Sequence, residues 1–432
     1  MVRASLRIIA AALVCAGLAG CAPDPGADLV LVNGRVYTFA WGEPASDGAI
    51  AADAPYDASG WRPDAESVAV AGGRIVFVGS SADSESFVGP ATRVVDVNGA
   101  TVLPGLVDSH THIVELGRKE NRIDLLGVET EAEAVGRVVE AATEVPEGEW
   151  IVGWGWDEGE WANRYPTAEL LSERFPDNPV VLRSLHGFAV WGNRAALDAA
   201  GIDRDTPEPE GGRILRDAAG NPSGVLIDRA TTLLTGAIPE ATDEQIKAHV
   251  LAGLETMAAD GYVAIHEAGA DSRIMGALEE LDAEGRLPIR VYAMLSLRDE
   301  ALCRSWIERG PSFADSMLTV RSVKAYYDAA LGSRGARLLE DYSDRPGHRG
   351  VSGSSYGFDY ELAAEMMRAG FQIGVHAIGD AGNRETLEFL ESVIADSPET
   401  KALRHRVEHA QVVHPDDFAR FAASEIIAAM QP

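Results

Sequence analysis

Cysteine is scarce in this sequence. The chain has 432 residues and three cysteines, and Cys15 and Cys21 both lie in its N-terminal leader. Cys303 is the only cysteine in the rest of the chain, so no internal disulfide can form there. The stability of the fold must therefore come from its hydrophobic core and from any bound metals.

Positive charge is also in short supply. The chain has 37 lysines and arginines against 67 aspartates and glutamates, which gives a formal net charge of −30. A protein that neutralises nucleic-acid phosphates needs clustered lysine and arginine, and no basic stripe is visible. We therefore exclude nucleic acid as a partner.

The apolar run of the leader is short for a membrane span. It covers residues 8–18, follows a basic start and precedes small residues, which is the layout of an export signal over residues 1–20. Leu18-Ala-Gly-Cys21 is similar to a bacterial lipobox, so we expect Cys21 to carry a lipid. The alternatives are a plain secretory signal and an N-terminal membrane helix. A lipid at Cys21 predicts a protein anchored in the cell envelope of a bacterium, facing the periplasm or the exterior.

The length and the remaining composition indicate a large globular protein. Hydrophobic residues make up 46% of the chain and charged residues 24%, which is ordinary for a protein with a sizeable core. At 432 residues the chain is too long for one ordinary domain, but it suits a large α/β barrel with an accessory domain and insertions.

Residues 21–104 are predicted to form a small β-sandwich domain. Asn33-Gly34 and Gly72-Gly73 are hairpin signals between its short β-rich segments, and residues 42–64 are a predicted loop. The predicted strands are residues 29–39, 67–70, 74–78 and 93–97.

Short apolar segments alternate with helix-like stretches after Pro104-Gly105. This alternation predicts an α/β fold with a parallel sheet, a TIM-like (β/α) barrel over residues 105–432 with seven of its eight strands present. The predicted strands are residues 106–110, 263–267, 289–295, 320–326, 372–376, 405–409 and 426–430. The clearest predicted helices are residues 243–259, 271–284, 360–369 and 380–395.

A long insertion follows the first barrel strand. Residues 115–261 are too many for one barrel loop, and they have elements of their own, including residues 150–156 and 180–185. We expect this segment to form an excursion over the mouth of the barrel.

Four histidines end predicted barrel strands. His110 and His112 lie two positions apart, so alternation along a strand points them to the same side, where both can reach one metal. His376 and His409 also end predicted strands, where a barrel forms its active site. For each one alone, the alternative is a hydrogen-bonded core histidine or a surface histidine. Together they predict a metal site.

A lysine joins this set. Lys324 lies in the predicted strand 320–326 among apolar residues, where we expect it to be buried. Burial lowers the pKa of a lysine and makes its amine a usable nucleophile, including toward carbon dioxide. The alternative is a lysine that reaches solvent or pairs with Asp328.

Several segments of the chain resemble the amidohydrolase superfamily in its YtcJ-like branch. Four of these segments lie in the predicted barrel and two in the insertion. They are Pro104-Gly-Leu-Val-Asp-Ser-His-Thr-His112, Val323-Lys-Ala-Tyr-Tyr-Asp-Ala-Ala-Leu-Gly-Ser-Arg-Gly-Ala336, His376-Ala-Ile-Gly-Asp380, Arg406-Val-Glu-His-Ala-Gln411, Trp154-Gly-Trp-Asp157 and His186-Gly-Phe-Ala-Val-Trp-Gly-Asn193.

The resemblance implies a role for each of the five barrel residues. His110 and His112 would bind one divalent metal, a carboxylated Lys324 would bridge two, and His376 and His409 would bind the second. One or two ions, with zinc the expected metal, would hold a hydroxide, and this makes Lys324, His376 and His409 the expected catalytic residues. The expected reaction is hydrolysis of a C–N bond in an amide, a formamide or a cyclic amide.

Three further residues are candidates for binding the substrate. His186 could reach it from the insertion, or be structural. Asp157 could line the pocket beside Trp154 and Trp156, although such tryptophans often belong to a core. Arg334 could bind an anionic group at the barrel mouth, with a salt bridge inside its loop as the alternative.

One expected residue of the family is not found in this sequence. The family takes its last metal ligand from an aspartate that ends strand eight, and this chain reaches only Ala429-Met-Gln-Pro432 at the predicted strand seven. We therefore expect a truncated chain with impaired catalysis.

Other functions fit the same residues. A hydrolase of this fold could act on lactones or phosphotriesters. A lipid-anchored solute-binding protein or metal carrier without turnover is a further alternative. The expected partners are a small amide-type substrate, the membrane through Cys21, and a second copy of the chain as a candidate homodimer.

Overall fold

The computed structural model describes residues 26–42, 44, 48–120, 122–157, 161, 165–185, 189–209, 212–312, 316–331 and 334–431. Contacts within the chain divide it into two compact units, Met1–Gly105 and Leu106–Pro432. Cys21 and His186, two residues with predicted roles, lie outside the described residues.

The first unit is built from small β-sheets. Its strands are β1 (Leu29–Val32), β2 (Arg35–Val36), β3 (Tyr56–Asp57), β4 (Gly60–Trp61), β5 (Ser67–Ala71), β6 (Arg74–Gly79), β7 (Arg93–Asp96) and β8 (Thr101–Val102), with the 3-10 helix η1 (Asp83–Phe87). One sheet has the order β6-β5-β1-β7, and two others join β2 to β8 and β3 to β4. Val30 and Ala69 are fully buried at the centre of its core.

The two predicted hairpin turns have different outcomes. Gly72-Gly73 joins the antiparallel strands β5 and β6, and both glycines have a positive φ, 55° and 73°, that favours glycine. The hairpin predicted at Asn33-Gly34 was wrong, because β1 and β2 lie in different sheets. The left-handed Asn33, with a φ of 57°, redirects the chain from one sheet to the other.

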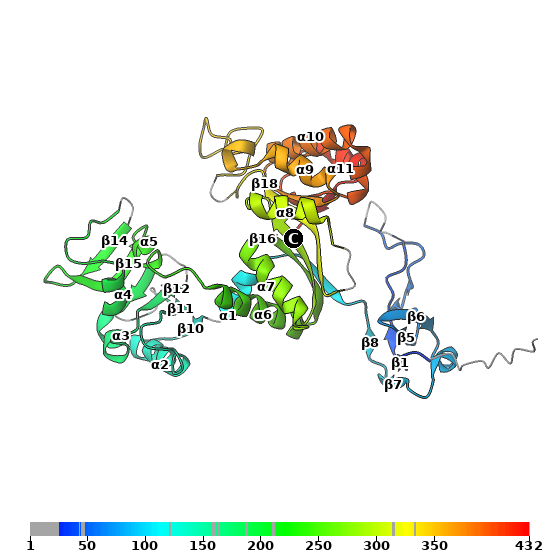
Figure 1. Ribbon diagram of the computed structural model, residues 1–432, viewed down its shortest axis with the longest axis horizontal. Coiled ribbons are helices and arrows are strands. Elements are labelled where there is room, and N and C mark those ends of the chain that lie inside the picture. Colours follow the sequence, from blue (N-terminus) through cyan, green and yellow to red (C-terminus); the bar gives the residue numbers. More distant parts are fainter. Residues whose placement is uncertain are drawn as a thin grey trace, which may run out of the picture. The chain divides into compact units, whose positions relative to one another are not determined.

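The second unit contains a sheet of seven parallel strands, which confirms the predicted α/β barrel architecture (Figure 1). Every predicted barrel strand is present close to its predicted bounds. The strands are β9 (Leu106–Thr111), β16 (Tyr262–Ala270), β17 (Arg290–Ser296), β18 (Leu318–Tyr326), β19 (Gln372–Ala377), β20 (Arg406–His409) and β21 (Ile427–Ala429). Each strand pairs with the next in the order β21-β20-β19-β18-β17-β16-β9.

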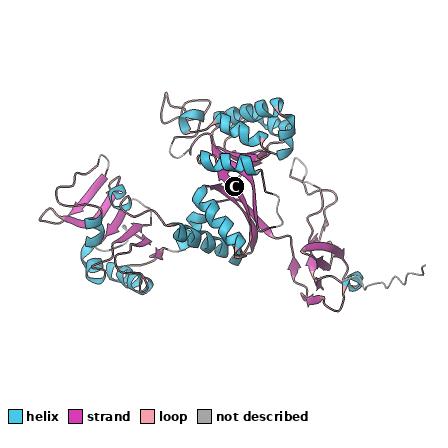
Figure 2. Cartoon of the chain, viewed as in Figure 1, coloured by secondary structure: helices cyan, strands magenta, loops and turns pink. Residues whose placement is uncertain are grey.

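Helices lie along the outer face of this sheet (Figure 2). They are α1 (Ile113–Glu120), α6 (Asp243–Ala259), α7 (Ser272–Ala283), α8 (Glu300–Arg309), α9 (Tyr360–Arg368), α10 (Asp380–Asp396) and α11 (Phe418–Ser424), with the 3-10 helices η2 (Gly353–Tyr356), η3 (Pro398–Leu403) and η4 (Pro415–Asp417). The sequence fixes their starts locally, since Thr242 and Gln245 form a capping box at α6 and Asp271 caps α7. Their apolar sides pack on buried strand residues such as Val323 and Ile373.

The insertion between α1 and α6 has a sheet of its own. Its strands are β10 (Ile123–Asp124), β11 (Ile151–Trp156), β12 (Val180–Ser184), β13 (Ala189–Gly192), β14 (Gly212–Arg216) and β15 (Pro222–Asp228), and its helices are α2 (Glu131–Ala141), α3 (Ala168–Arg174), α4 (Arg194–Ala199) and α5 (Thr231–Thr235). The strand order is β10-β11-β12-β13-β15-β14. β10, β11 and β12 run parallel, and the later pairs are antiparallel.

Tryptophans form the core of this inserted sheet. Trp156 is fully buried, and its ring centre lies 5.6 Å from that of Trp161 and 6.3 Å from that of Trp191. All three indole N–H groups donate to backbone carbonyls. Trp156 therefore belongs to the core of the inserted sheet, which is the alternative foreseen for it.

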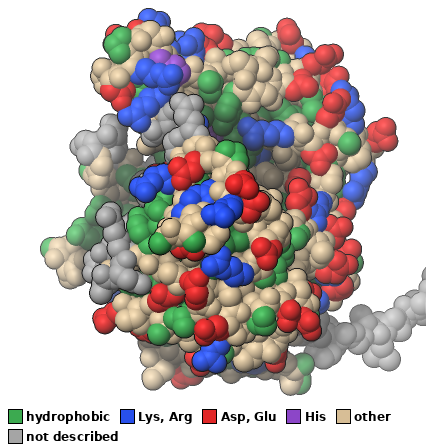
Figure 3. All heavy atoms as spheres, turned by 90° about the vertical axis from the view of Figure 1, so that its left-hand side faces the viewer, with side chains coloured by type: hydrophobic (Ala, Val, Ile, Leu, Met, Phe, Trp, Pro, Cys, Tyr) green, Lys and Arg blue, Asp and Glu red, His purple; other side chains and the backbone are tan. Residues whose placement is uncertain are grey.

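The surface carries mixed charge. On the face shown in Figure 3, Asp and Glu side chains are interspersed with Lys and Arg. Among the described residues, no helix has both the length and the apolar character needed to cross a bilayer.

His405, just before β20, is a buried histidine whose protonation should lower the stability of the fold. It is 1% exposed, and its Nδ1 accepts a hydrogen bond from the backbone N–H of Ile373 at 3.1 Å. Burial lowers the pKa of His405 to about 4 from the ordinary 6.5. The unfolded chain therefore binds a proton more readily than the folded chain between these pH values, so this contribution to stability is complete above pH 6.5 and is lost as the pH falls toward 4.

We expect His405→Asn, which keeps an acceptor but does not titrate, to remove this contribution. The difference in free energy of unfolding between the wild type and the variant should change by up to about 3 kcal/mol from pH 7 to pH 4, measured by urea unfolding. His414→Asn, at a partly exposed histidine, is the control for the loss of a histidine. A His405→Asn difference that is the same at every pH would contradict the prediction.

Candidate metal centre

The curvature of the barrel sheet brings together residues from its two sides. Four strands separate β20 from β9 in the sheet, so a flat sheet would hold them roughly 24 Å apart. The ring centres of His409 on β20 and His110 on β9 are instead 4.8 Å apart. The sheet must therefore curl, and the carboxyl ends of its strands face one another.

The five residues predicted to hold metal form one cluster at these strand ends. The ring centre of His110 lies 5.5 Å from that of His112, and the ring centres of His376 and His409 are 4.5 Å apart. The Nζ of Lys324 lies 3.4 Å from the Nε2 of His110. The structure thus brings all five side chains to one place.

Lys324 is buried, with 1% of its surface exposed. The alternative of a lysine that reaches solvent was therefore wrong. Asp328 is not its partner either, because its carboxylate accepts the backbone N–H groups of Arg337, Ile378 and Gly379, each at 2.9 Å. Asp328 thereby ties the end of β18 to the loop after β19, where His376 lies 3.7 Å from its carboxylate.

A buried charged network stands behind His110. The Nδ1 of His110 is 2.6 Å from Oε2 of Glu408, a residue with no exposed surface. Arg406 contacts both oxygens of Glu408, at 2.7 Å and 3.0 Å, and donates to the carbonyl of Ser109 and toward Nδ1 of His266. Because Nδ1 of His110 donates to Glu408, its Nε2 carries the lone pair and faces Lys324.

Burial lowers the pKa values of four groups in the cluster. It lowers the pKa of His112 to about 4 and that of His376 to about 3, and neighbouring positive groups act in the same direction. Burial, followed by the effect of His110, also lowers the pKa of His409. Burial lowers the pKa of Lys324 to about 8. Neutral imidazoles are the form that binds a metal.

The backbone is strained where His409 leaves its strand. His409 and Ala410 have positive φ values of 75° and 40°, a region that non-glycine residues rarely occupy. Such strain is often found at functional sites, where the surrounding structure holds it in place.

The cluster contains side chains of a kind that binds metals, and they lie close together. They are not arranged around one common point. In the part of the chain that the structure describes, no three His, Cys, Asp or Glu side chains form a ligand group. The Nε2 of His376 is buried without a hydrogen-bond partner, which is the state of a nitrogen available to a metal. Imidazoles suit zinc and similar ions. The ligand assignment itself stays a prediction.

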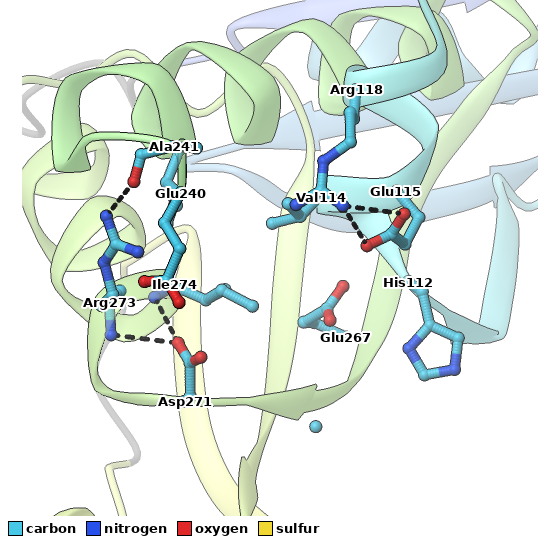
Figure 4. Close-up of a pocket in the computed structure, with 12 residues that line it drawn as sticks. His112, Val114, Glu115, Arg118, Glu240, Ala241, Glu267, Asp271, Arg273 and Ile274 are labelled. Atoms are coloured by element: carbon cyan, nitrogen blue, oxygen red, sulfur yellow. Dashed lines mark hydrogen bonds and ion pairs between the residues drawn. The ribbon is translucent and has the colours of Figure 1, made fainter. Parts of the chain in front are cut away.

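A cavity of about 480 Å³ lies beside the cluster (Figure 4). His112 and Glu267 line it, together with charged residues of α1 and α7. Gly269 also lines it, and a Cβ there would lie 3.8 Å from Cγ of Lys324. The cavity therefore borders the cluster and has room for a small substrate.

Glu267 is a buried acid on the wall of this cavity. It is 2% exposed, and its Oε2 accepts the backbone N–H of Ile113 at 2.7 Å, next to His112. Burial raises the pKa of Glu267 to about 7. Glu267 thus fixes the peptide that carries His112.

Two of the substrate residues predicted from sequence, Arg334 and Asp157, are not part of the cluster. Arg334 forms an ion pair with Asp344, which is the alternative foreseen for it. Asp157 directly follows β11 in the inserted sheet and does not line the cavity. Their roles, and that of His186, stay predictions.

Sequence reasoning missed the residues that support the cluster. Glu408, Arg406, Glu267 and His266 were given no role, although each lies in or next to an apolar strand that ends at the predicted site. A charged side chain inside such a strand is costly to bury unless it is paired. Charged residues in apolar strands could therefore have been predicted to support the site.

The chain was compared with protein families, curated proteins and solved structures. Residues 93–432 match the amidohydrolase family. The chain is 31% identical to the protein LONG AFTER FAR-RED 3 of Arabidopsis thaliana, over 94% of this chain and 68% of the relative. It is 32% identical to YtcJ of Bacillus subtilis, over 81% and 65%, and 28% identical to an N-substituted formamide deformylase of Arthrobacter pascens, over 83% and 68%. The chain thus spans about two thirds of the length of these relatives.

The solved structures agree with this result. A metal-dependent hydrolase of Pyrococcus furiosus matches with a TM-score of 0.70 and 25% identity, covering 93% of this chain and 76% of that one. A metal-dependent hydrolase of Pyrococcus horikoshii matches with a TM-score of 0.67, which supports the same fold, at 22% identity over 93% and 74%. On the family match and these relatives, the chain belongs to the amidohydrolase family.

Proposed function

We propose that this protein is a metal-dependent hydrolase of C–N bonds in amides, formamides or cyclic amides. The observation that carries the proposal is the convergence of His110, His112, Lys324, His376 and His409 at the carboxyl ends of the barrel strands. The name of the Arthrobacter relative, an N-substituted formamide deformylase, supports this class of bond.

The five residues of the cluster would hold one or two divalent ions, and zinc is the metal we propose. His110 and His112 leave the same strand, and His376 and His409 come from adjacent strands. Lys324 lies next to His110 and would bind through oxygens if carbon dioxide adds to its amine to give a carbamate with loss of a proton. When bound, such an ion lowers the pKa of water and polarises a carbonyl group.

The protein's own residues bind and orient the reacting groups. Glu408 holds the His110 ring in one tautomer and one orientation. Glu267 fixes the peptide after His112, and Asp328 fixes the loops beyond β18 and β19. The cavity beside His112 offers the substrate a partly enclosed place next to the cluster.

The first test is to change Lys324. We expect Lys324→Ala to lose bound metal and at least 100-fold of its C–N hydrolysis together, because the buried lysine belongs to the cluster and lies next to His110. Elemental analysis and a panel of amides, formamides, cyclic amides, lactones and phosphotriesters provide the two measurements. Lys324→Met, which preserves more of the buried volume, should behave like Lys324→Ala.

Lys247→Ala is the matched control, because Lys247 only pairs with Glu280 and Glu284 on helix surfaces. It should keep metal and activity. A Lys324→Ala protein with unchanged metal content would favour the binding-protein alternative. A panel in which only lactones or phosphotriesters react would favour the other hydrolase classes.

The second test concerns the support of His110. We expect Glu408→Gln to weaken metal binding by roughly 10-fold to 100-fold, since a neutral acceptor orients the imidazole less firmly and leaves Arg406 without its buried counter-ion. Competition with a chromophoric chelator measures the affinity without any substrate. Glu391→Gln removes a surface partner of Arg420 and is the control. Equal metal affinity in Glu408→Gln and the wild type would refute the role given to Glu408.

We further propose that Cys21 carries a lipid that anchors the protein in the bacterial cell envelope. The support is the leader sequence that ends in Leu18-Ala-Gly-Cys21. Cells fed labelled palmitate should incorporate the label into the protein, and Cys21→Ser should abolish it, whereas Cys303→Ser should not. Equal labelling of Cys21→Ser would rule out this anchor.

A further inference from the structure

Arg298 lies just beyond β17, at the carboxyl end of the barrel strands. The backbone N–H of Leu297 donates to the carbonyl oxygen of Lys324 at 2.9 Å, and the N–H of Asp299 donates to the carbonyl of Ser296 at 3.0 Å. The turn that carries Arg298 is therefore fixed beside Lys324.

The guanidinium group of Arg298 packs on an aromatic ring of the site. Its central carbon lies 4.2 Å from the ring centre of Tyr326 and 5.5 Å from that of Tyr356. The ring centre of Tyr326 is in turn 4.9 Å from Nζ of Lys324 and 5.6 Å from the ring centre of His376. Tyr326 thus contacts both Arg298 and the cluster.

Tyr326 also lies next to a residue of the cavity wall. A Cβ on Gly269 would lie 3.3 Å from the hydroxyl oxygen of Tyr326, and Gly269 lines the cavity. Arg298 and the cluster therefore share this one tyrosine, which lies beside the cavity wall.

The acidic neighbours of Arg298 in the sequence are committed elsewhere. Asp299 accepts from the hydroxyl and the N–H of Ser272 and from the N–H of Leu302. Glu300 accepts from Nε of Arg304. Among the residues that the structure describes, no ion pair involves Arg298, and its side chain is exposed.

A guanidinium held on an aromatic face, with its N–H groups unused, is suited to bind a carboxylate through two parallel hydrogen bonds. We propose that Arg298 binds a carboxylate of the substrate, so that the preferred substrates are amides that carry a carboxylate group. This inference rests on the proposed C–N hydrolysis. It gives Arg298 the role that the sequence suggested for Arg334, which pairs with Asp344 instead.

The test compares matched substrates. N-formylglycine, N-formyl-β-alanine and N-formyl-4-aminobutyrate are each assayed against the corresponding carboxamide, with the metal-loaded full chain. We expect the wild type to prefer the acids. Arg298→Gln should lower kcat/KM for the acids by about 10-fold to 100-fold, mainly through KM, and leave the carboxamides nearly unchanged.

The remaining variants test the geometry. Arg298→Lys keeps the charge but not the planar donor pair, so it should recover only part of the preference. Arg304→Gln removes a nearby arginine that is paired with Glu300 and Glu365, and it should keep the full preference for the acids. Equal kcat/KM for acids and carboxamides in the wild type, or an unchanged preference in Arg298→Gln, would overturn the inference.

Failure of the proposed function can be told apart from failure of this inference. If none of the formamides is hydrolysed, the same compounds serve as ligands in calorimetric titrations of the metal-loaded protein. Tighter binding of the acids by the wild type, lost in Arg298→Gln, would then still support the carboxylate site. Equal dissociation constants in the two proteins would overturn it.

Discussion

The contact between His110 and Glu408 joins residues that are 298 positions apart and belong to strands on opposite sides of the sheet. It can form only because the sheet curls through the four strands between them. Arg406 reinforces it by binding Glu408, the carbonyl of Ser109 and His266. The geometry of the candidate site depends on this closure, since the other histidines approach His110 across the same space.

Burial and charge act against each other in this network. Burial disfavours the ionised form of Glu408, but hydrogen bonds from His110 and the charge of Arg406 outweigh it, and the pKa of Glu408 is lowered. For His112 and His376 burial is the largest effect, and the pKa of each is lowered. The same fold therefore holds a charged support behind the site and neutral donors in front of it.

Arg334 and Arg298 both lie near the strand ends, and the partners of each decide whether it is available to a substrate. Arg334 follows β18, the strand of Lys324, and was a candidate for binding an anionic group. It forms an ion pair with Asp344 in the same loop instead. Arg298 lies at the end of the neighbouring strand, where Asp299 is occupied in capping α8 and Glu300 binds Arg304. Its guanidinium rests on Tyr326, next to Lys324. A substrate carboxylate is the partner that this arrangement favours.

The sequence by itself determined the barrel strands, the main helices and the residues that gather at the strand ends. These follow from local rules, because apolar periodicity, capping residues such as Thr242 and the two-residue spacing of His110 and His112 act over a few positions. Local rules fail where the strand before a turn and the strand after it pair in different sheets. This happens at Asn33-Gly34.

Only the tertiary structure decided which buried groups are partners. Glu408 binds the distant His110 as well as the nearby Arg406, Asp328 accepts backbone N–H groups and does not pair with Lys324, and Trp156 belongs to the core of the inserted sheet. Each outcome depends on residues far apart in the sequence that approach only when the sheets form. Desolvation then makes pairing compulsory for every buried charge, and no local pattern in the chain can state which partner it will meet.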